Sequence, residues 1–125
     1  MLALDYGAAR TGVAVSDPTG TLARPLTVVE RAGTEAGLNR LADLVRDEGA
    51  ELVVVGLPLT LRGERGAQAL ETDRFVEALR AVLNVPVEAF DERFTTALAG
   101  GGGSAPEDAR AAAHLLSSYL MWASR

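Results

Sequence analysis

Residues 2–17 read LALDYGAARTGVAVSD, and their pattern predicts the first two strands of a sheet. An apolar run over residues 2–5 and an alternating run over residues 11–17 are each followed by turn residues. Such runs are typical of strands joined by short hairpins. Residues 22–30 continue the pattern, so the sequence predicts three antiparallel strands. Pro25 indicates that the third strand lies at an edge of the sheet.

The hydrophobic spacing then changes to the i, i+3, i+4, i+7 pattern of one helix face, at Leu38, Leu41, Ala42 and Val45. Gly49 is placed to end this helix. The β-branched run at residues 51–57 does not alternate, which is typical of a strand buried on both faces.

A second helix is predicted over residues 67–83, with Phe75, Leu79 and Val82 facing inward. Residues 85–90 form the fifth predicted strand. A capping-box pattern over residues 104–107 begins a last helix that runs to about Trp122. The order β-β-β-α-β-α-β-α predicts an α/β fold: a five-stranded mixed sheet flanked by helices, in which the first, fourth and fifth strands are parallel.

The composition narrows the possible classes of protein. A length of 125 residues predicts a single domain, residues 1–125. The absence of cysteine excludes a disulfide scaffold and a thiol nucleophile, and a single histidine, His114, argues against a zinc site. Neither a membrane span nor a signal peptide is recognisable, so we expect a cytoplasmic protein with no membrane partner.

The charges set how this chain could hold a phosphate. The net charge is −5, and all twelve basic residues are arginines. Any phosphate contact must therefore come from a guanidinium group or a backbone N–H.

Acidic residues follow two of the parallel strands. Asp5 ends the first strand, and Asp91 and Glu92 end the fifth. Ligands of open α/β sheets bind beyond the carboxyl ends of the strands, so we expect these side chains to converge at one edge.

Asp108 adds a third element from the first turn of the last helix. It shares a face with the apolar stripe Ala112, Leu115, Tyr119 and Trp122, and it therefore points toward the sheet. Stabilisation of the helix dipole is the alternative role, but Glu107 already provides it from a solvent-facing position. Carboxylates without histidine or cysteine suit Mg²⁺ or Mn²⁺, and two such ions ~4 Å apart would support phosphodiester hydrolysis.

Four stretches together resemble the YqgF/RuvX family, which has an RNase H-like fold: LALDYGAARTGVAVSD at 2–17, VVVGLPLTLRGERGAQA at 53–69, DERFTT at 91–96 and DARAAAHLLSSYL at 108–120. Family members are described as Holliday junction resolvases and as pre-16S rRNA processing nucleases. The resemblance implies that Asp5 is the metal ligand of the first strand and Asp108 the acid of the helix. The Asp91-Glu92-Arg93 motif supplies the middle acid. Either Asp91 or Glu92 could be the ligand, and Asp91 is favoured, which gives the metal set Asp5, Asp91 and Asp108.

Four arginines are candidate phosphate contacts. Arg10 lies in the first hairpin turn, Arg62 and Arg65 lie in a glycine-rich loop, and Arg93 follows the middle acids. Family members usually carry a longer, often lysine-rich segment before the last helix, whereas here residues 97–103 are short and end in four glycines.

Two glycines of the first motif have two interpretations. Gly7 and Gly12 either keep side chains away from the space above Asp5 or provide the positive φ angle of a hairpin.

The leading hypothesis is a hydrolase: a metal-dependent nuclease acting on structured nucleic acid, as a monomer or homodimer. Processing of the 5′ end of pre-16S rRNA is the first choice of reaction, and cleavage of Holliday junctions or other DNA is the second. The glycine-rich hairpin is also similar to the phosphate-binding hairpin of actin-like ATPases, and tight ATP binding would favour that alternative. A catalytically silent nucleic-acid-binding module is the third hypothesis, and retention of the four acids argues against it.

Overall fold

Three strands open the chain and pair with their neighbours in sequence, as the hairpin pattern predicts. The structure, a computed structural model, describes residues 1–58, 63–64, 66–91 and 106–123. Its strands are β1 (Leu2–Asp5), β2 (Arg10–Ser16), β3 (Ala23–Glu30), β4 (Val53–Leu57) and β5 (Val87–Asp91). Its helices are α1 (Glu35–Glu48), α2 (Ala67–Val82) and α3 (Glu107–Ala123).

The five strands form one mixed sheet in the order β3-β2-β1-β4-β5. β1 pairs antiparallel with β2, and β2 with β3, whereas β1, β4 and β5 are parallel. The predicted sheet, including the edge position of β3, is therefore confirmed. The carboxyl ends of β1, β4 and β5 consequently lie at one edge, where ligands of such sheets bind.

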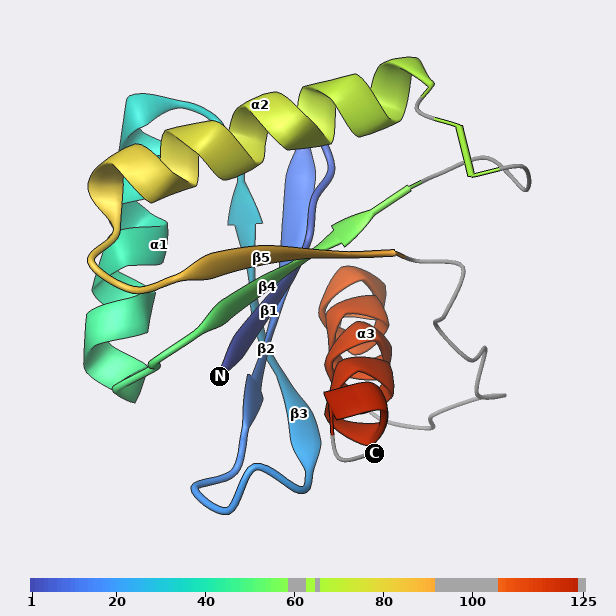
Figure 1. Cartoon of the computed structure of the whole chain (residues 1–125). Helices are drawn as coiled ribbons and strands as arrows, with labels where there is room; N and C mark the ends of the chain where they lie inside the picture. The colour runs from blue at the N-terminus through green and yellow to red at the C-terminus, as the bar shows by residue number, and fades with distance from the viewer. Residues whose placement is uncertain (59–62, 65, 92–105, 124–125) are drawn as a thin grey trace.

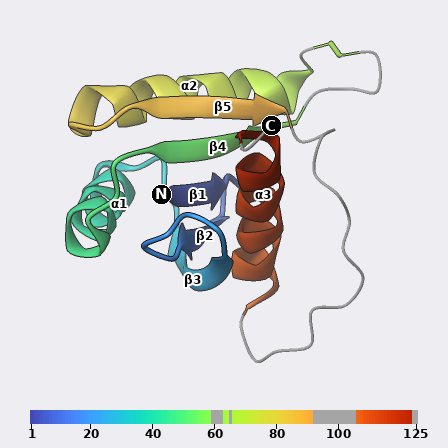
Figure 2. The ribbon, with the colours of Figure 1, turned by 60° about the horizontal axis from the view of Figure 1, so that its bottom comes forward.

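Helices cover both faces of the sheet, with α1 and α2 on one side and α3 on the other (Figure 1). Leu4 and Val55 pack with Phe75 and Leu79 of α2, while Ala3 and Val54 pack with Leu116 of α3. Each strand thus sends alternate residues into two cores. Figure 2 shows α3 lying crosswise to the strands, near the carboxyl ends of β1, β4 and β5.

Local signals fix the helix ends. Thr34 Oγ1 accepts a hydrogen bond from Gly37 N (3.1 Å) at the start of α1, and Gly49 ends that helix with φ 64°. The prediction for Val82 was wrong: its exposed fraction is 43%, because it is the last residue of α2, where the chain turns toward β5. β4 and β5 begin two residues later than predicted, and the capping serine Ser104 lies outside the described residues.

Across the described residues, no helix is both long enough and apolar enough to span a bilayer.

Candidate active site

Asp5 lies at the carboxyl end of β1, on the face of the sheet that α3 covers. Ala3, two residues earlier, packs in the core beneath α3, and alternation places Asp5 on the same face. Across the antiparallel ladder Asp5 pairs with Gly12 of β2. Asp5 is partly buried. Asp5 therefore lies at the carboxyl edge of the sheet, as predicted, and on the face of α3.

The first turn of α3 rests on Gly12. A Cβ atom at Gly12 would overlap the carbonyl group of Asp108 and would lie 2.9 Å from the backbone nitrogen of Ala109. Gly12 is not among the glycines with positive φ. Its role is therefore the close approach of a helix backbone, and this approach brings Asp108 to the strand position next to Asp5.

Asp108 is held by an ion pair with Arg10. The Nε atom of Arg10 lies 3.0 Å from Oδ2 of Asp108, and the two side chains are 57% and 41% exposed. Arg10 and Gly12 are two residues apart in β2, so they share the face beneath α3. The guanidinium that was predicted to contact phosphate thus lies beside the helix acid in this structure.

The turn that presents Arg10 is anchored at several points. Thr11 is fully buried, and its Oγ1 accepts from Gly7 N (3.4 Å) and donates to Gly7 O (3.3 Å). The ring of Tyr6 stacks on Phe75 of α2 with centroids 4.2 Å apart. Gly7 is required here because a Cβ would lie 2.5 Å from the carbonyl oxygen of Arg10. The backbone beneath Arg10 is therefore fixed.

Asp91 ends β5 at the same edge of the sheet but at a position of the opposite face. It pairs with Leu57, whereas Phe90, one residue earlier, packs in the core beneath α3. Because side chains alternate along a strand, Asp91 belongs to the face of α1 and α2. The structure thus brings Asp5 and Asp108 to one face and places Asp91 on the other.

Four predicted site residues cannot be placed. Glu92, Arg93, Arg62 and Arg65 lie outside the described residues.

The carboxylates of Asp5 and Asp108 are the kind of ligand that a hard cation binds. Asp5 and Asp108 offer only carboxylate oxygens, which Mg²⁺ and Mn²⁺ prefer. Within residues 1–58, 63–64, 66–91 and 106–123, no group of three or more potential ligands stands close enough to hold an ion. The described residues therefore include two candidate donors, Asp5 and Asp108, and Gly12, the glycine at which their elements meet.

An aromatic cluster closes the other end of α3. Phe90 and Tyr119 meet edge to face with centroids 5.4 Å apart, and Trp122 lies 5.8 Å from each. Tyr119 donates a hydrogen bond to Glu88 Oε2 (2.7 Å). Burial, together with this bond to Glu88, raises the pKa of Tyr119 to about 12. The cluster ties α3 to β5, although Trp122, predicted to complete the apolar stripe, remains 46% exposed.

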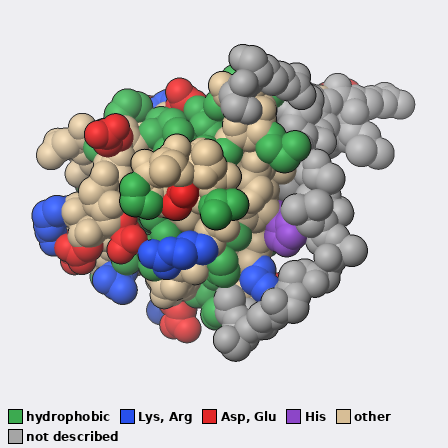
Figure 3. Space-filling view, turned by 90° about the horizontal axis from the view of Figure 1, so that it is seen from below, with side chains coloured by type: hydrophobic (Ala, Val, Ile, Leu, Met, Phe, Trp, Pro, Cys, Tyr) green, Lys and Arg blue, Asp and Glu red, His purple; other side chains and the backbone are tan. Residues whose placement is uncertain are grey.

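A cavity of about 750 Å³ lies away from this site. Its lining includes Met1, Asp17, Glu48 and Leu52, so it opens near the amino ends of β1 and β4. Figure 3, which views the molecule from below, shows acidic and basic side chains intermingled on that face. Ligands of open α/β sheets bind at the opposite, carboxyl ends, so we do not assign the active site there.

Comparison with known proteins identifies the family. The family model for RuvX, described as Holliday junction resolvase, matches residues 1–121. The chain belongs to the RuvX family. RuvX proteins are nucleases, enzymes that hydrolyse phosphodiester bonds.

Relatives and solved structures agree with this family. A protein of Chloroflexus aggregans named "Putative pre-16S rRNA nuclease" is 52% identical over 79% of this chain and 70% of its own length. A protein of the same name from Rubrobacter xylanophilus is 46% identical over 94% of this chain and 89% of its own. The structure of T. thermophilus RuvC in complex with a Holliday junction substrate has a TM-score of 0.71 at 17% identity, covering 99% of this chain and 95% of that one. A second Thermus thermophilus RuvC structure has a TM-score of 0.60 at 21% identity, covering 99% and 96%. These likenesses establish the RNase H-like fold.

Sequence reasoning missed the relationship between Arg10, Gly12 and Asp108. The alternation of residues 10, 12 and 14 in one strand places them on one face, and the small residues Gly12 and Ala14 could have indicated a closely packed helix.

Proposed function

We propose that this RuvX protein is a metal-dependent nuclease acting on structured nucleic acid, with Asp5, Asp108 and one acid of the Asp91-Glu92 pair as its catalytic carboxylates. The close approach of α3 to Gly12 carries this proposal, because it sets the helix acid above the strand pair that contains Asp5. We propose that residues 1–125 act as one domain.

The register of β5 bears on the choice of the middle acid. Asp91 pairs with Leu57 and belongs to the face away from α3, so it is poorly placed to share an ion with Asp5 and Asp108. The adjacent Glu92 is therefore the better candidate, in place of the Asp91 that the motif alone favoured. Asp91→Asn and Glu92→Gln, assayed side by side, distinguish the two.

We propose Mg²⁺ or Mn²⁺ as the cofactor, with two ions bound. When bound, the metal would activate the attacking water and stabilise the leaving oxygen of the phosphodiester. Asp5 would hold a ligand position from the rigid end of β1. Asp108 would approach from the first turn of α3, once its oxygen is released from Arg10.

Pre-16S rRNA is the first choice of substrate, cleaved at its 5′ end in the cytoplasm. The relatives that carry that name are 38–52% identical over most of this chain, whereas the complex with a Holliday junction is a likeness of fold at 17% identity. Holliday junctions and other DNA remain the alternative substrates. No membrane is involved, and the active unit is a monomer or homodimer.

Arg10, Arg62, Arg65 and Arg93 are the proposed contacts to phosphate. Each contact that is lost should reduce the slope of log K against log salt by about one unit. Binding of the RNA by single Arg→Ala variants, titrated with salt, would identify which of the four contact the backbone.

One assay tests the proposed function directly. Labelled rRNA precursor, a Holliday junction and single strands are incubated with the protein and Mg²⁺, Mn²⁺ or chelator. We expect cleavage of the precursor with metal, none with chelator, and none with Asp5→Asn. Cleavage that persists in chelator or in Asp5→Asn would contradict the proposal.

A further inference from the structure

The ion pair between Arg10 and Asp108 places a cation where the proposed function needs a metal. Oδ2 of Asp108 lies 3.0 Å from Arg10 Nε in an ion pair, so a positive charge already stands beside this oxygen. A guanidinium and a divalent ion compete for the same carboxylate, because each is attracted to its negative charge and each repels the other.

We propose that Arg10 is a positioning residue that couples the two binding events of the site. In the free protein its guanidinium occupies Asp108 and weakens metal binding. A phosphate of the nucleic acid draws Arg10 away, and Asp108 is then released for the metal. This inference rests on the proposed nuclease function.

The geometry allows this exchange without movement of the backbone. Thr11 and the stack of Tyr6 on Phe75 hold the turn, and Arg31 N donates to Ala9 O at 3.0 Å just before Arg10. The Arg10 side chain itself is 57% exposed, so its guanidinium can turn from Asp108 to a phosphate in solvent. A planar guanidinium binds phosphate as readily as carboxylate.

The exposure of the Arg10–Asp108 ion pair determines how strongly Arg10 weakens metal binding. Ion pairs this exposed are weak, so removing Arg10 should tighten metal binding only about two- to fivefold. Coupling between ligands is reciprocal, so nucleic acid should tighten metal binding by the same factor by which metal tightens nucleic acid binding.

The test measures Mn²⁺ affinity by the electron paramagnetic resonance signal of the free ion, with no cleavage involved. Wild type is compared with Arg10→Ala, with Arg10→Gln, which keeps most of the side-chain length, and with Arg24→Ala. Arg24 forms an exposed pair with Glu48 (3.6 Å), and its strand partner Val15 lies five residues along β2 from Arg10, so it is a matched control. Both Arg10 variants should bind Mn²⁺ about two- to fivefold tighter than wild type, and Arg24→Ala should not.

The second measurement adds a hairpin RNA with phosphorothioate linkages, which resist cleavage, and subtracts the Mn²⁺ bound by the RNA alone. The RNA should tighten Mn²⁺ binding to wild type, and this gain should shrink in both Arg10 variants. If Asp5→Asn and Asp108→Asn weaken Mn²⁺ binding but the Arg10 variants match wild type, the coupling is refuted and the nuclease proposal stands. If Asp5→Asn and Asp108→Asn bind Mn²⁺ as wild type does, the metal site is refuted and the coupling with it.

Discussion

Gly12 of β2 lies directly beneath the backbone of Asp108. The same glycine pairs with Asp5 across the β1–β2 ladder. One residue therefore contacts both elements that carry the candidate acids, and its missing side chain sets the distance between helix and sheet.

Substitution of this glycine should disturb stability and activity together. In Gly12→Ala the new methyl group would overlap the Asp108 carbonyl, so the first turn of α3 must move outward. We expect unfolding free energy, measured in urea, to fall by about 1–3 kcal/mol. Cleavage of the rRNA precursor should fall about a hundredfold, because small displacements of catalytic groups are costly.

Gly33→Ala is the matched control for this substitution. Its Cβ would lie 3.5 Å from the hydroxyl of Tyr6, an ordinary contact, so unfolding free energy should change by less than about 0.5 kcal/mol. Equal effects of the two substitutions would show that Gly12 has no special role in docking α3.

Neutralising either acid should separate activity from stability. Asp5→Asn should abolish cleavage while leaving unfolding free energy unchanged or raised, because it removes one of the carboxylates that repel each other. Asp108→Asn should also abolish cleavage, and loss of the exposed pair with Arg10 should cost no more than about 1 kcal/mol. Urea unfolding beside the cleavage assay checks both variants. If Asp5→Asn is unfolded, Asp5 has a structural role. If Asp108→Asn cleaves at the wild-type rate, Asp108 only caps the first turn of α3 and has no catalytic role.

The sheet could be predicted from the sequence because its signals are local. Alternation in residues 11–17 and the unbroken apolar run that begins β4 depend only on which faces of each strand are buried. The face of Asp91 was also within reach, since it follows the inward-facing Phe90 by one residue.

The contact between Gly12 and α3 could not be predicted in the same way. The small residues Gly12 and Ala14 indicate that something packs closely on this face, but they do not identify the helix that does so, which lies nearly a hundred residues later in the chain. The pairing of Arg10 with Asp108 has the same origin. A hairpin arginine facing solvent and one facing a distant carboxylate look identical in the sequence.

Asp17 should make stability depend on pH in the acid range. Its carboxylate accepts hydrogen bonds from Leu22 N (2.9 Å), Thr19 Oγ1 (2.5 Å) and Thr21 N (2.8 Å). These bonds, that of Leu22 first, lower the pKa of Asp17 from 3.8 to about 2. Between these values the unfolded chain binds more protons, so this contribution is complete above pH 3.8 and is lost as pH falls through about 2.

Unfolding in urea between pH 6 and pH 2 measures this contribution. Asp17→Asn should be less stable than wild type at pH 6, and the difference should narrow as pH falls below 3.8. A constant difference across the range would show that the turn does not depend on the charge of Asp17.

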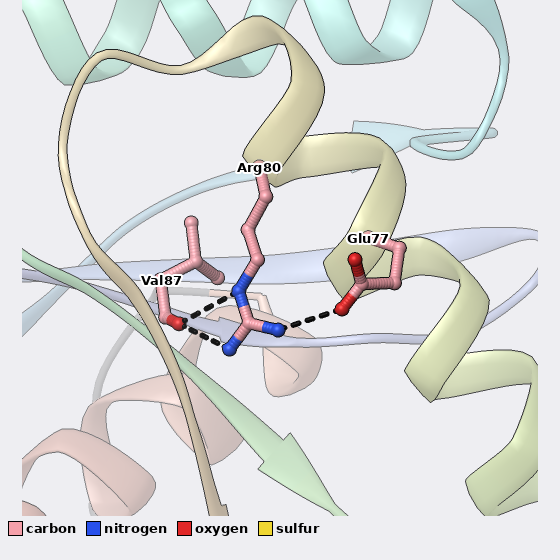
Figure 4. A network of polar contacts seen from close by, with 3 residues as sticks. All are labelled: Glu77, Arg80 and Val87. Atoms are coloured by element: carbon pink, nitrogen blue, oxygen red, sulfur yellow. Dashed lines mark hydrogen bonds and ion pairs between the residues drawn. The ribbon is translucent and has the colours of Figure 1, made fainter.

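Arg80 should stabilise the outer edge of the sheet. Its Nε and Nη2 atoms donate to the carbonyl oxygen of Val87 in β5, at 3.3 and 2.8 Å, and Nη1 bonds Glu77 at 2.7 Å (Figure 4). Arg80→Ala should lower unfolding free energy by about 0.5–1.5 kcal/mol. Arg46→Ala is the control, because Arg46 pairs with Asp43 at the same helical spacing (2.8 Å). Both variants are compared with wild type by thermal and urea unfolding. If Arg80→Ala and Arg46→Ala lower the unfolding free energy equally, the bonds to Val87 contribute nothing.

The crosswise position of α3 has a consequence for the newly made chain. Asp5, in β1, is synthesised before the other four strands, whereas α3, which carries Asp108, is synthesised after all five. Hairpin and parallel strands can form before α3 exists, but the two acids meet only after that helix has been made and has docked. An unfinished chain, still attached to the ribosome, would therefore carry a nearly complete sheet and no working nuclease.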